Sequence, residues 1–233
     1  MTELLFPARP QATVAVTGSD KRLSVGRIFC VGRNFAEHAK EMGAEVDREA
    51  PFYFMKDSSA IVASGSTIPY PPGTKDFQHE VELVVAIGAP AWGVGVDTAL
   101  DAVFGYAVGL DMTRRDLQAA AKAKQRPWDF AKNFECSAVI TPIVPKAAFT
   151  PADQNISLSV NGTVRQQGRL GDLVWSIAEL ISHLSHHYHL VPGDLIYTGT
   201  PAGVGPVAPG DVIVGSVEGL PELRLTIAPP ESY

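Results

Sequence analysis

The chain has 233 residues, of which 45% are hydrophobic and 19% are charged, a composition typical of a globular protein with one large domain or two small ones. Its net charge of −6 argues against a nucleic-acid partner, because proteins that bind phosphate backbones concentrate Lys and Arg. No apolar run approaches the roughly 18 residues of a membrane span, and the N-terminus lacks the pattern of a signal peptide. With only two cysteines and no disulfide framework, we expect a cytoplasmic protein without a membrane partner.

The predicted elements favour an α+β fold that is mainly β. Glycine and proline are frequent and separate short apolar runs, which is typical of β structure with many turns. The dipeptide Asn161-Gly162 predicts a two-residue hairpin turn, and Cys30 is expected to be a small buried side chain within a strand. Strands are predicted at residues 12–17, 27–32, 60–64, 80–88, 103–110, 138–144, 156–161, 195–198, 212–216 and 222–227.

Three helices are predicted from apolar spacing and from residues that favour helix starts. The first covers about residues 35–42, with Asn34 as its N-cap. The second covers about 114–124, where Thr113 and Asp116 resemble a capping box. The third covers about 174–188 and follows Asp172. Residues 1–25 are predicted to form a small N-terminal appendage to a single domain.

The first predicted helix carries His38 and Glu41, which are three residues apart and therefore share a face. A carboxylate that orients an imidazole makes the histidine a candidate general base. The alternative is a solvated helix, because one charged pair at this spacing is commonplace.

An acidic pair opens the apolar run at 80–88. Residues two apart on a strand point to the same face, so Glu80 and Glu82 project together. Asp111 closes the apolar run 103–110 and can supply a third oxygen. Three carboxylates without cysteine suit Mg²⁺, Mn²⁺ or Ca²⁺ better than Zn²⁺. The alternative is the solvated face of an antiparallel strand, although an unpaired buried carboxylate at Asp111 would be costly.

Polar residues that follow Asp111 suggest contacts with an anion. Arg115 and Gln118 would share a face near the N-terminus of the second helix, where an arginine can bind a substrate carboxylate; a surface arginine is the alternative. Lys132 lies between Phe130 and Phe134 and is a candidate to stabilise developing negative charge. Its alternative is a side chain that extends to solvent.

Two further segments contain residues that occur in binding sites. The glycine-rich run 197–205 follows a strand but lacks the Gly-Lys-Ser/Thr of a P-loop; its backbone could approach a small ligand closely, or form a plain turn. The histidines at 183, 186, 187 and 189 are interpreted as a solvated face rather than a metal site, because one helix supplies them all.

Taken together, several segments resemble the fumarylacetoacetate hydrolase family in its short single-domain branch. They occur in the family's order over about residues 26–228, and the series is far more specific than any one of them. The matching segments are VGRNFAEH at 31–38, FYFMK at 52–56, HEVE at 79–82, GLDMTRRDLQ at 109–118, AKNF at 131–134 and TGTPAGVG at 198–205.

This resemblance implies a twisted, barrel-like β-roll catalytic domain over residues 26–233, a divalent cation and a homodimer. By position, it implies that Glu80, Glu82 and Asp111 bind the cation, with Mg²⁺ expected and Mn²⁺ or Ca²⁺ as alternatives. It also matches a dyad on a lid segment and positions that contact the substrate or transition state. The dyad is His38 and Glu41, and the contacting residues are Lys132, Arg115, Gln118, Thr200 and Lys56.

The activity implied by the resemblance is hydrolysis of a carbon–carbon bond in a 2,4-dioxo acid. The runs 112–118 and 126–129 look most like members that hydrolyse fumarylpyruvate, an acylpyruvate of aromatic (gentisate) catabolism, to fumarate and pyruvate. The alternatives are decarboxylation of oxaloacetate, isomerisation of a 2-hydroxy-dienedioate, and a silent metal-stabilised binding protein. Asp57 and Asn133 depart from the family's usual proline and serine, and these departures bear on substrate choice.

Overall fold

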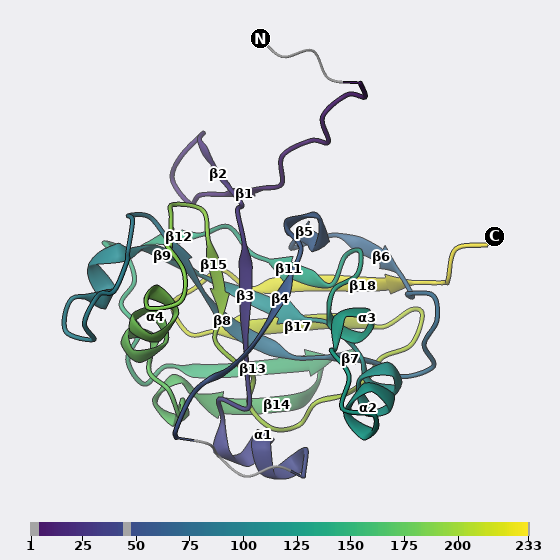
Figure 1. The fold of residues 1–233 in the computed structure, drawn as a ribbon. Helices are drawn as coiled ribbons and strands as arrows, with labels where there is room; N and C mark the ends of the chain where they lie inside the picture. Colours follow the sequence, from purple (N-terminus) through teal and green to yellow (C-terminus); the bar gives the residue numbers. More distant parts are fainter. Residues whose placement is uncertain (1–4, 44–47, 233) are drawn as a thin grey trace.

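The computed structural model describes residues 5–43 and 48–232. Within them, two large β-sheets pack against each other, and four α-helices lie around the sheets (Figure 1). This arrangement confirms the prediction of a mainly β, α+β fold. The helices are α1 (Ala36–Glu41), α2 (Arg115–Ala123), α3 (Asp129–Lys132) and α4 (Ile177–Ser185), and 3₁₀ turns cover Ser58–Ala60, Ala99–Ala102 and Leu170–Asp172.

The strands form two large and two small sheets. The first large sheet has the order β4 (Phe52–Lys56), β3 (Ile28–Gly32), β15 (Leu195–Tyr197), β8 (Val81–Ile87), β9 (Val103–Asp111), β11 (Ala138–Ile140) and β5 (Ile61–Ala63), with β12 (Val144–Pro145) also paired to β9. The second has the order β14 (Thr163–Arg169), β13 (Asn155–Val160), β17 (Val212–Val217), β18 (Leu223–Ala228) and β6 (Thr67–Pro69). The small sheets are β10 (Thr113–Arg114), β7 (Phe77–His79) and β16 (Gly205–Pro206), and β1 (Thr13–Ala15) with β2 (Arg22–Ser24).

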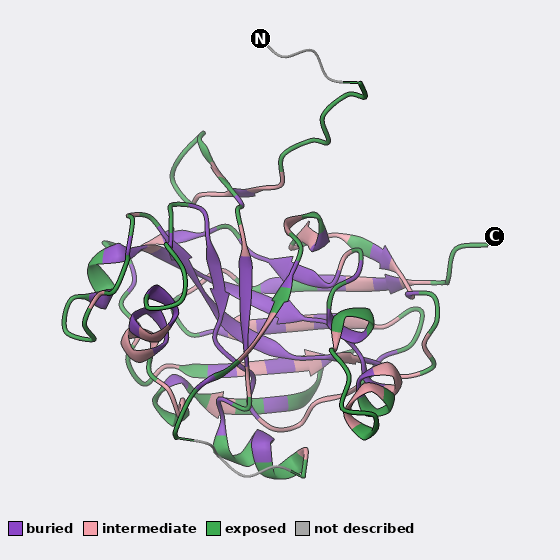
Figure 2. Cartoon of the chain, in the orientation of Figure 1, coloured by how far each residue is buried: buried purple, intermediate pink, exposed green. Residues whose placement is uncertain are grey.

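Both faces of the first sheet are buried, as strand β8 shows. Leu83 and Val85 belong to the apolar core shared by the two large sheets, whereas Val84 and Ala86 belong to a second apolar cluster. Successive side chains of a strand point to opposite faces, so these clusters lie on opposite sides of β8. Burial on both sides explains why the segment reads as an uninterrupted apolar run. Figure 2 shows this buried centre in purple.

The turn chemistry at Asn161-Gly162 is confirmed, and one strand prediction is wrong. Val160 pairs with Thr163 across the turn, and both turn residues have positive φ, 51° and 78°, as a type I′ hairpin requires. The strand predicted at 138–144 is instead two strands, β11 and β12. The segment between these two strands contains Pro142, which has no N–H to donate to a neighbouring strand. The next residue, Ile143, donates its N–H to the Ala15 carbonyl oxygen at 2.8 Å.

The N-cap predicted at Asn34 is wrong, because this side chain is used elsewhere. Helix α1 begins after Phe35 without a side-chain cap. The fully buried Asn34 amide donates to the carbonyl oxygens of Trp175 at 3.1 Å and Thr198 at 2.7 Å, and accepts from the Trp175 N–H at 2.7 Å. These bonds tie the entrance of α1 to two distant loops.

The other two helix starts also differ from the predictions. Helix α2 has no side-chain cap, and Asp116 instead accepts hydrogen bonds from Thr74 Oγ1 at 2.5 Å and from the Lys75 N–H at 2.9 Å. Helix α4 covers Ile177–Ser185, which is shorter at both ends than the predicted 174–188, and its capping box is formed by Ser176 and Glu179. For Asp116, the tertiary contact replaces the predicted cap.

The N-terminal hairpin of β1 and β2 projects beside the first sheet (Figure 1). Val14 and Val25 nevertheless lie in the same apolar cluster as Ile28, so a separate appendage at residues 1–25 remains a prediction. Within the described ranges, no helix combines the length and apolar character needed to cross a membrane.

Candidate active site

The three predicted cation ligands meet where β8 begins and β9 ends. The strands are antiparallel, and the Asp111 N–H donates to the Glu80 carbonyl oxygen at 2.9 Å. Glu80, Glu82 and Asp111 each offer a carboxylate oxygen, and these oxygens lie within 4.8 Å of one another. The residues are only 5%, 2% and 0% exposed, respectively, which excludes a solvated strand face.

Basic side chains contact two of these carboxylates. Lys132 Nζ lies 2.6 Å from Glu80 Oε2 and 2.7 Å from Asp111 Oδ2, Arg115 also pairs with Glu80, and Lys56 Nζ lies 2.9 Å from Asp111 Oδ1. Burial would raise the pKa of Glu80, but the charges of Lys132 and Arg115 lower it overall. Burial would lower the pKa of Lys132, but Asp111 and Glu80 raise it overall. Lys132 is therefore buried and charged. This excludes the alternative of a side chain that extends to solvent.

Glu82 has no basic partner among the described residues and accepts a hydrogen bond from the Gly199 N–H at 2.8 Å. Burial and the negative charges of Asp111 and Glu80 raise its pKa well above the ordinary value. Asp111 is fully buried too, but Lys56 lies beside its Oδ1 and Lys132 beside its Oδ2. A cation between the three carboxylates would offset the burial and the repulsion at Glu82. Because all the ligand atoms are carboxylate oxygens, the residues fit a hard divalent cation.

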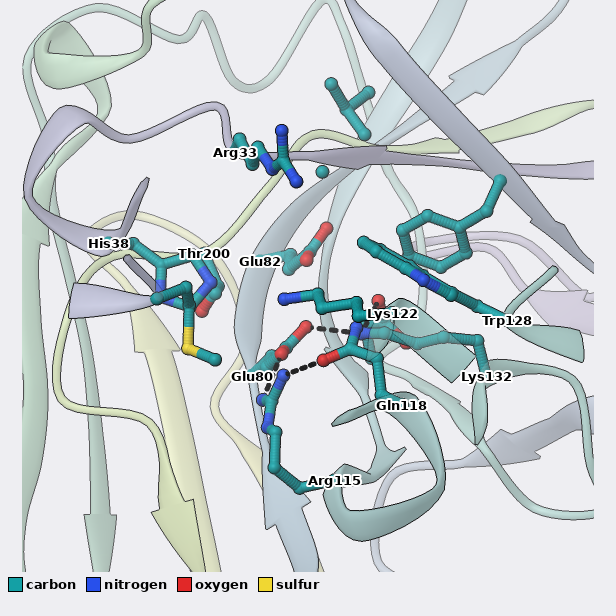
Figure 3. Close-up of a pocket in the computed structure, with 15 residues that line it drawn as sticks. Arg33, His38, Glu80, Glu82, Arg115, Gln118, Lys122, Trp128, Lys132 and Thr200 are labelled. Atoms are coloured by element: carbon teal, nitrogen blue, oxygen red, sulfur yellow. Dashed lines mark hydrogen bonds and ion pairs between the residues drawn. The ribbon is translucent and has the colours of Figure 1, made fainter. Parts of the chain in front are cut away.

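Helix α1 brings His38 of the predicted dyad to the same pocket (Figure 3). His38 Nδ1 lies 3.1 Å from Glu41 Oε2, and His38 is 7% exposed. Glu41 also accepts a hydrogen bond from the Gly203 N–H at 3.0 Å, which links the dyad to the glycine-rich loop. With Nδ1 held by Glu41, Nε2 is the ring atom left for proton transfer. This burial excludes a fully solvated helix.

Arg115 and Gln118 lie together as their spacing predicts, and both are buried. Arg115 Nη1 donates to Gln118 Oε1 at 2.7 Å, and its Nε donates to Gln78 Oε1 at 2.8 Å. With the Glu80 contact, the guanidinium has three protein acceptors. The alternative of a surface arginine is therefore excluded, and the contact between Arg115 and substrate is a prediction.

Thr200 is held by a residue that the sequence analysis missed. Thr200 Oγ1 donates to the Val81 carbonyl oxygen at 2.8 Å and accepts from Gln166 Nε2 at 2.8 Å. Gln166 is fully buried, and its Oε1 accepts from the Val81 N–H at 3.1 Å and lies 3.0 Å from His79 Nδ1. It stands among polar residues of β14, so no local pattern marks it.

The two departures from the family pattern contact each other. The Asp57 N–H donates to Asn133 Oδ1 at 2.8 Å, a bond that proline at position 57 could not make because proline has no N–H. Neither residue lines the pocket. The bond lies directly after Lys56 and Lys132, so it joins the two segments that carry these lysines.

The structure agrees with two interpretations of the sequence, namely that the histidines at 183–189 are not a metal site and that Cys30 is a buried side chain. Within the described chain, the acidic trio is the only group of three or more His, Cys, Asp or Glu residues placed to bind a metal, and the residues at 186, 187 and 189 are exposed. His183 is half-buried and stacks on Tyr53 with ring centroids 5.6 Å apart. Cys30 is fully buried, and burial raises its pKa well above the ordinary value.

Comparison with known proteins agrees with this geometry. Fumarylpyruvate hydrolase of Ralstonia sp. is 49% identical over 192 residues, which are 82% of this chain and 100% of the relative. The mitochondrial oxaloacetate tautomerase FAHD1 of Arabidopsis thaliana is 43% identical over 86% of this chain and 90% of its own length. The crystal structure of fumarylpyruvate hydrolase from Pseudomonas aeruginosa with Mn²⁺ and pyruvate has a TM-score of 0.94 at 43% identity, covering 98% of this chain and 100% of that one.

The structural match confirms the predicted twisted β fold. Residues 27–228 match the family described as Fumarylacetoacetate (FAA) hydrolase C-terminal. The chain therefore belongs to the fumarylacetoacetate hydrolase family.

Proposed function

We propose that this protein hydrolyses a carbon–carbon bond of a 2,4-dioxo acid, and that fumarylpyruvate is its substrate, giving fumarate and pyruvate. The observation that carries the proposal is the buried His38, which is paired with Glu41 and lines the same pocket as Lys132 and the acidic residues. A general base, a buried ammonium group and a hard-cation site are the groups this hydrolysis needs. The names of the relative at 49% identity and of the similar crystal structure support the choice of substrate.

Glu80, Glu82 and Asp111 would hold the divalent cation, for which Mg²⁺ is the expected ion and Mn²⁺ or Ca²⁺ the alternatives. When bound, the cation supplies Lewis acidity and a template for the oxo-acid end of the substrate. The similar crystal structure contains Mn²⁺ and pyruvate, which supports both the ion class and an oxo acid as its neighbour. Lys56 keeps Asp111 in place through its contacts with Asp111 and the Met112 carbonyl oxygen, 2.9 and 3.2 Å away.

The chain's own residues then account for proton movement. Glu41 holds the ring of His38, whose Nε2 takes a proton from water, and the hydroxide attacks the carbonyl carbon at C4. Lys132 stabilises the resulting oxyanion. The bond between C3 and C4 breaks, C3 receives a proton, and pyruvate and fumarate leave. The predicted substrate contacts are Arg115, Gln118, Thr200 and Lys56.

We infer that α1 acts as a lid, and its position supports this role. The helix carries His38 into the pocket, and Met42 directly after it also lines the pocket. Closure over a bound substrate would exclude bulk water and bring the base to the substrate.

Oxaloacetate chemistry is the second candidate, favoured by the name of the 43% identical Arabidopsis relative. Tautomerisation or decarboxylation of oxaloacetate requires no attacking water, so it depends less on a water-activating base. Isomerisation of a 2-hydroxy-dienedioate and silent binding remain alternatives, and the predicted homodimer remains a prediction.

Product assays distinguish these candidates. The protein is incubated with fumarylpyruvate, acetylpyruvate or oxaloacetate, with Mg²⁺ or Mn²⁺ and with a chelator, and pyruvate and fumarate are measured. We expect cation-dependent hydrolysis of fumarylpyruvate, lost in His38→Ala but not in His186→Ala, an exposed histidine. Oxaloacetate decarboxylation should be spared more by His38→Ala. Equal loss of both activities would contradict the assigned base, and no turnover of any 2,4-dioxo acid with cation bound would favour silent binding.

A further inference from the structure

Two cationic side chains at the pocket are not used to neutralise its acidic residues. Arg33 and Lys122 both line the pocket that contains the acidic cluster (Figure 3). Within residues 5–43 and 48–232, neither forms an ion pair with a carboxylate, whereas Lys132, Arg115 and Lys56 each contact Glu80 or Asp111. Glu80 and Asp111 thus already share three basic neighbours, and the charges of Arg33 and Lys122 are additional.

An aromatic wall connects these two cations. The Arg33 guanidinium carbon lies 5.6 Å from the centre of the Phe52 ring, and Lys122 Nζ lies 5.1 Å from the Trp128 ring. The two rings pack together, with centroids 4.9 Å apart. Arg33 follows β3 and Lys122 belongs to α2, but each contacts one ring of this packed pair, and the Trp128 ring lines the pocket together with both cations.

The backbone at Arg33 is held in a conformation that few side chains adopt. Its φ is 61°, in the left-handed region. Asn34 is fixed by its three buried hydrogen bonds, and a Cβ on Gly32 would lie 2.6 Å from the Phe52 ring. Such conformations persist where neighbours enforce them, and they are concentrated at ligand sites.

Lys122 lies in an environment with excess positive charge. Burial and the charges of Arg115 and Arg33 lower its pKa. An anion placed between Arg33 and Lys122 would relieve this repulsion. Because both side chains line the pocket, a bound substrate can place one of its negative groups there.

We propose that Arg33 and Lys122 bind the carboxylate at the acyl end of a dicarboxylic 2,4-dioxo acid. The inference rests on the proposed function, in which the oxo-acid end of the substrate lies at the acidic cluster. Fumarylpyruvate has a carboxylate at each end, whereas acetylpyruvate ends in a methyl group. The two cations therefore select dicarboxylic over monocarboxylic acylpyruvates, through charge-assisted hydrogen bonds to a group that only the former carry.

The test measures binding separately from turnover. In a His38→Ala background with Mn²⁺, calorimetric dissociation constants for fumarylpyruvate and acetylpyruvate are compared for Arg33→Gln, Lys122→Gln and the parent. Each variant should weaken fumarylpyruvate binding about tenfold or more, because a hydrogen bond to a charged group is lost, while acetylpyruvate binding changes less than about twofold. Lys124→Gln, which removes an exposed charge two residues away and outside the pocket, is the matched control and should bind both ligands as the parent does.

The outcomes separate the two proposals. Equal weakening for both ligands, or no weakening for either, overturns the assignment of Arg33 and Lys122. If the parent shows the expected preference but the wild-type protein hydrolyses neither compound, the proposed function fails and the carboxylate site stands. If the wild-type protein binds neither compound, both proposals are overturned. Arg33→Lys should recover part of the preference, since it restores the charge.

Discussion

Replacing Lys132 by methionine should destabilise the cation-free protein strongly, because two buried carboxylates lose their shared partner. Lys132 is 2% exposed, and its Nζ lies 2.6 and 2.7 Å from Glu80 and Asp111. Removing one partner of a buried ion pair costs about 3–5 kcal/mol. For a protein of this size, 1 kcal/mol corresponds to about 2–4 °C in Tm. The Tm of Lys132→Met in chelator should therefore fall by about 6–20 °C.

A divalent cation should recover much of this loss. The variant leaves the negative charge of Glu80 and Asp111 less balanced, so Mn²⁺ should raise its Tm more than it raises the wild-type Tm. Thermal unfolding in chelator and in Mn²⁺ measures both effects, with Lys124→Met as the control for loss of an exposed lysine. A Tm in chelator within about 2 °C of wild type, or an equal response to Mn²⁺, would refute the view that Lys132 balances these carboxylates. Hydrolysis should separately fall by about 10²–10³-fold.

Three further substitutions test the rest of the site. Because the pKa of Glu82 is raised in the folded protein, the cation-free fold loses stability as the pH rises above the unfolded pKa of about 4.3. Glu82→Gln should flatten this pH dependence in chelator and abolish stabilisation by Mn²⁺. An unchanged slope of unfolding free energy against pH would contradict this role of Glu82. Asn34→Ala removes three buried hydrogen bonds and should cost about 3 kcal/mol in denaturant unfolding, with a loss below about 1 kcal/mol counting against it. Glu41→Gln retains an acceptor for the Gly203 N–H but removes the carboxylate that orients the His38 ring, so kcat should fall about 100-fold with KM little changed. An unaltered kcat would exclude the dyad.

Local patterns were sufficient where the physical cause is local. The period of two along a strand put Glu80 and Glu82 on one face, and the structure brings them together with Asp111. The Asn161-Gly162 turn followed from the positive φ that type I′ geometry requires. The family resemblance supplied the order of the motifs, but not the contacts among them.

Capping predictions failed because they compare only neighbours in sequence. Asn34 and Asp116 are good helix-capping residues, yet the fold offers them backbone partners at Trp175 and Lys75. A side chain of this kind bonds wherever donors are left unpaired on burial, and only the packing of distant loops determines where that happens.

The sequence alone determined the strand-rich fold class, the hairpin turn and the acidic pair, since each depends on residues within a few positions of one another. Tertiary structure alone decided which charges neutralise one another: Lys132 meets Glu80 across 52 residues, while Arg33 and Lys122 reach the same pocket from different elements. Electrostatic energy depends on distance in space and on burial, and neither quantity is encoded in the spacing of residues along the chain.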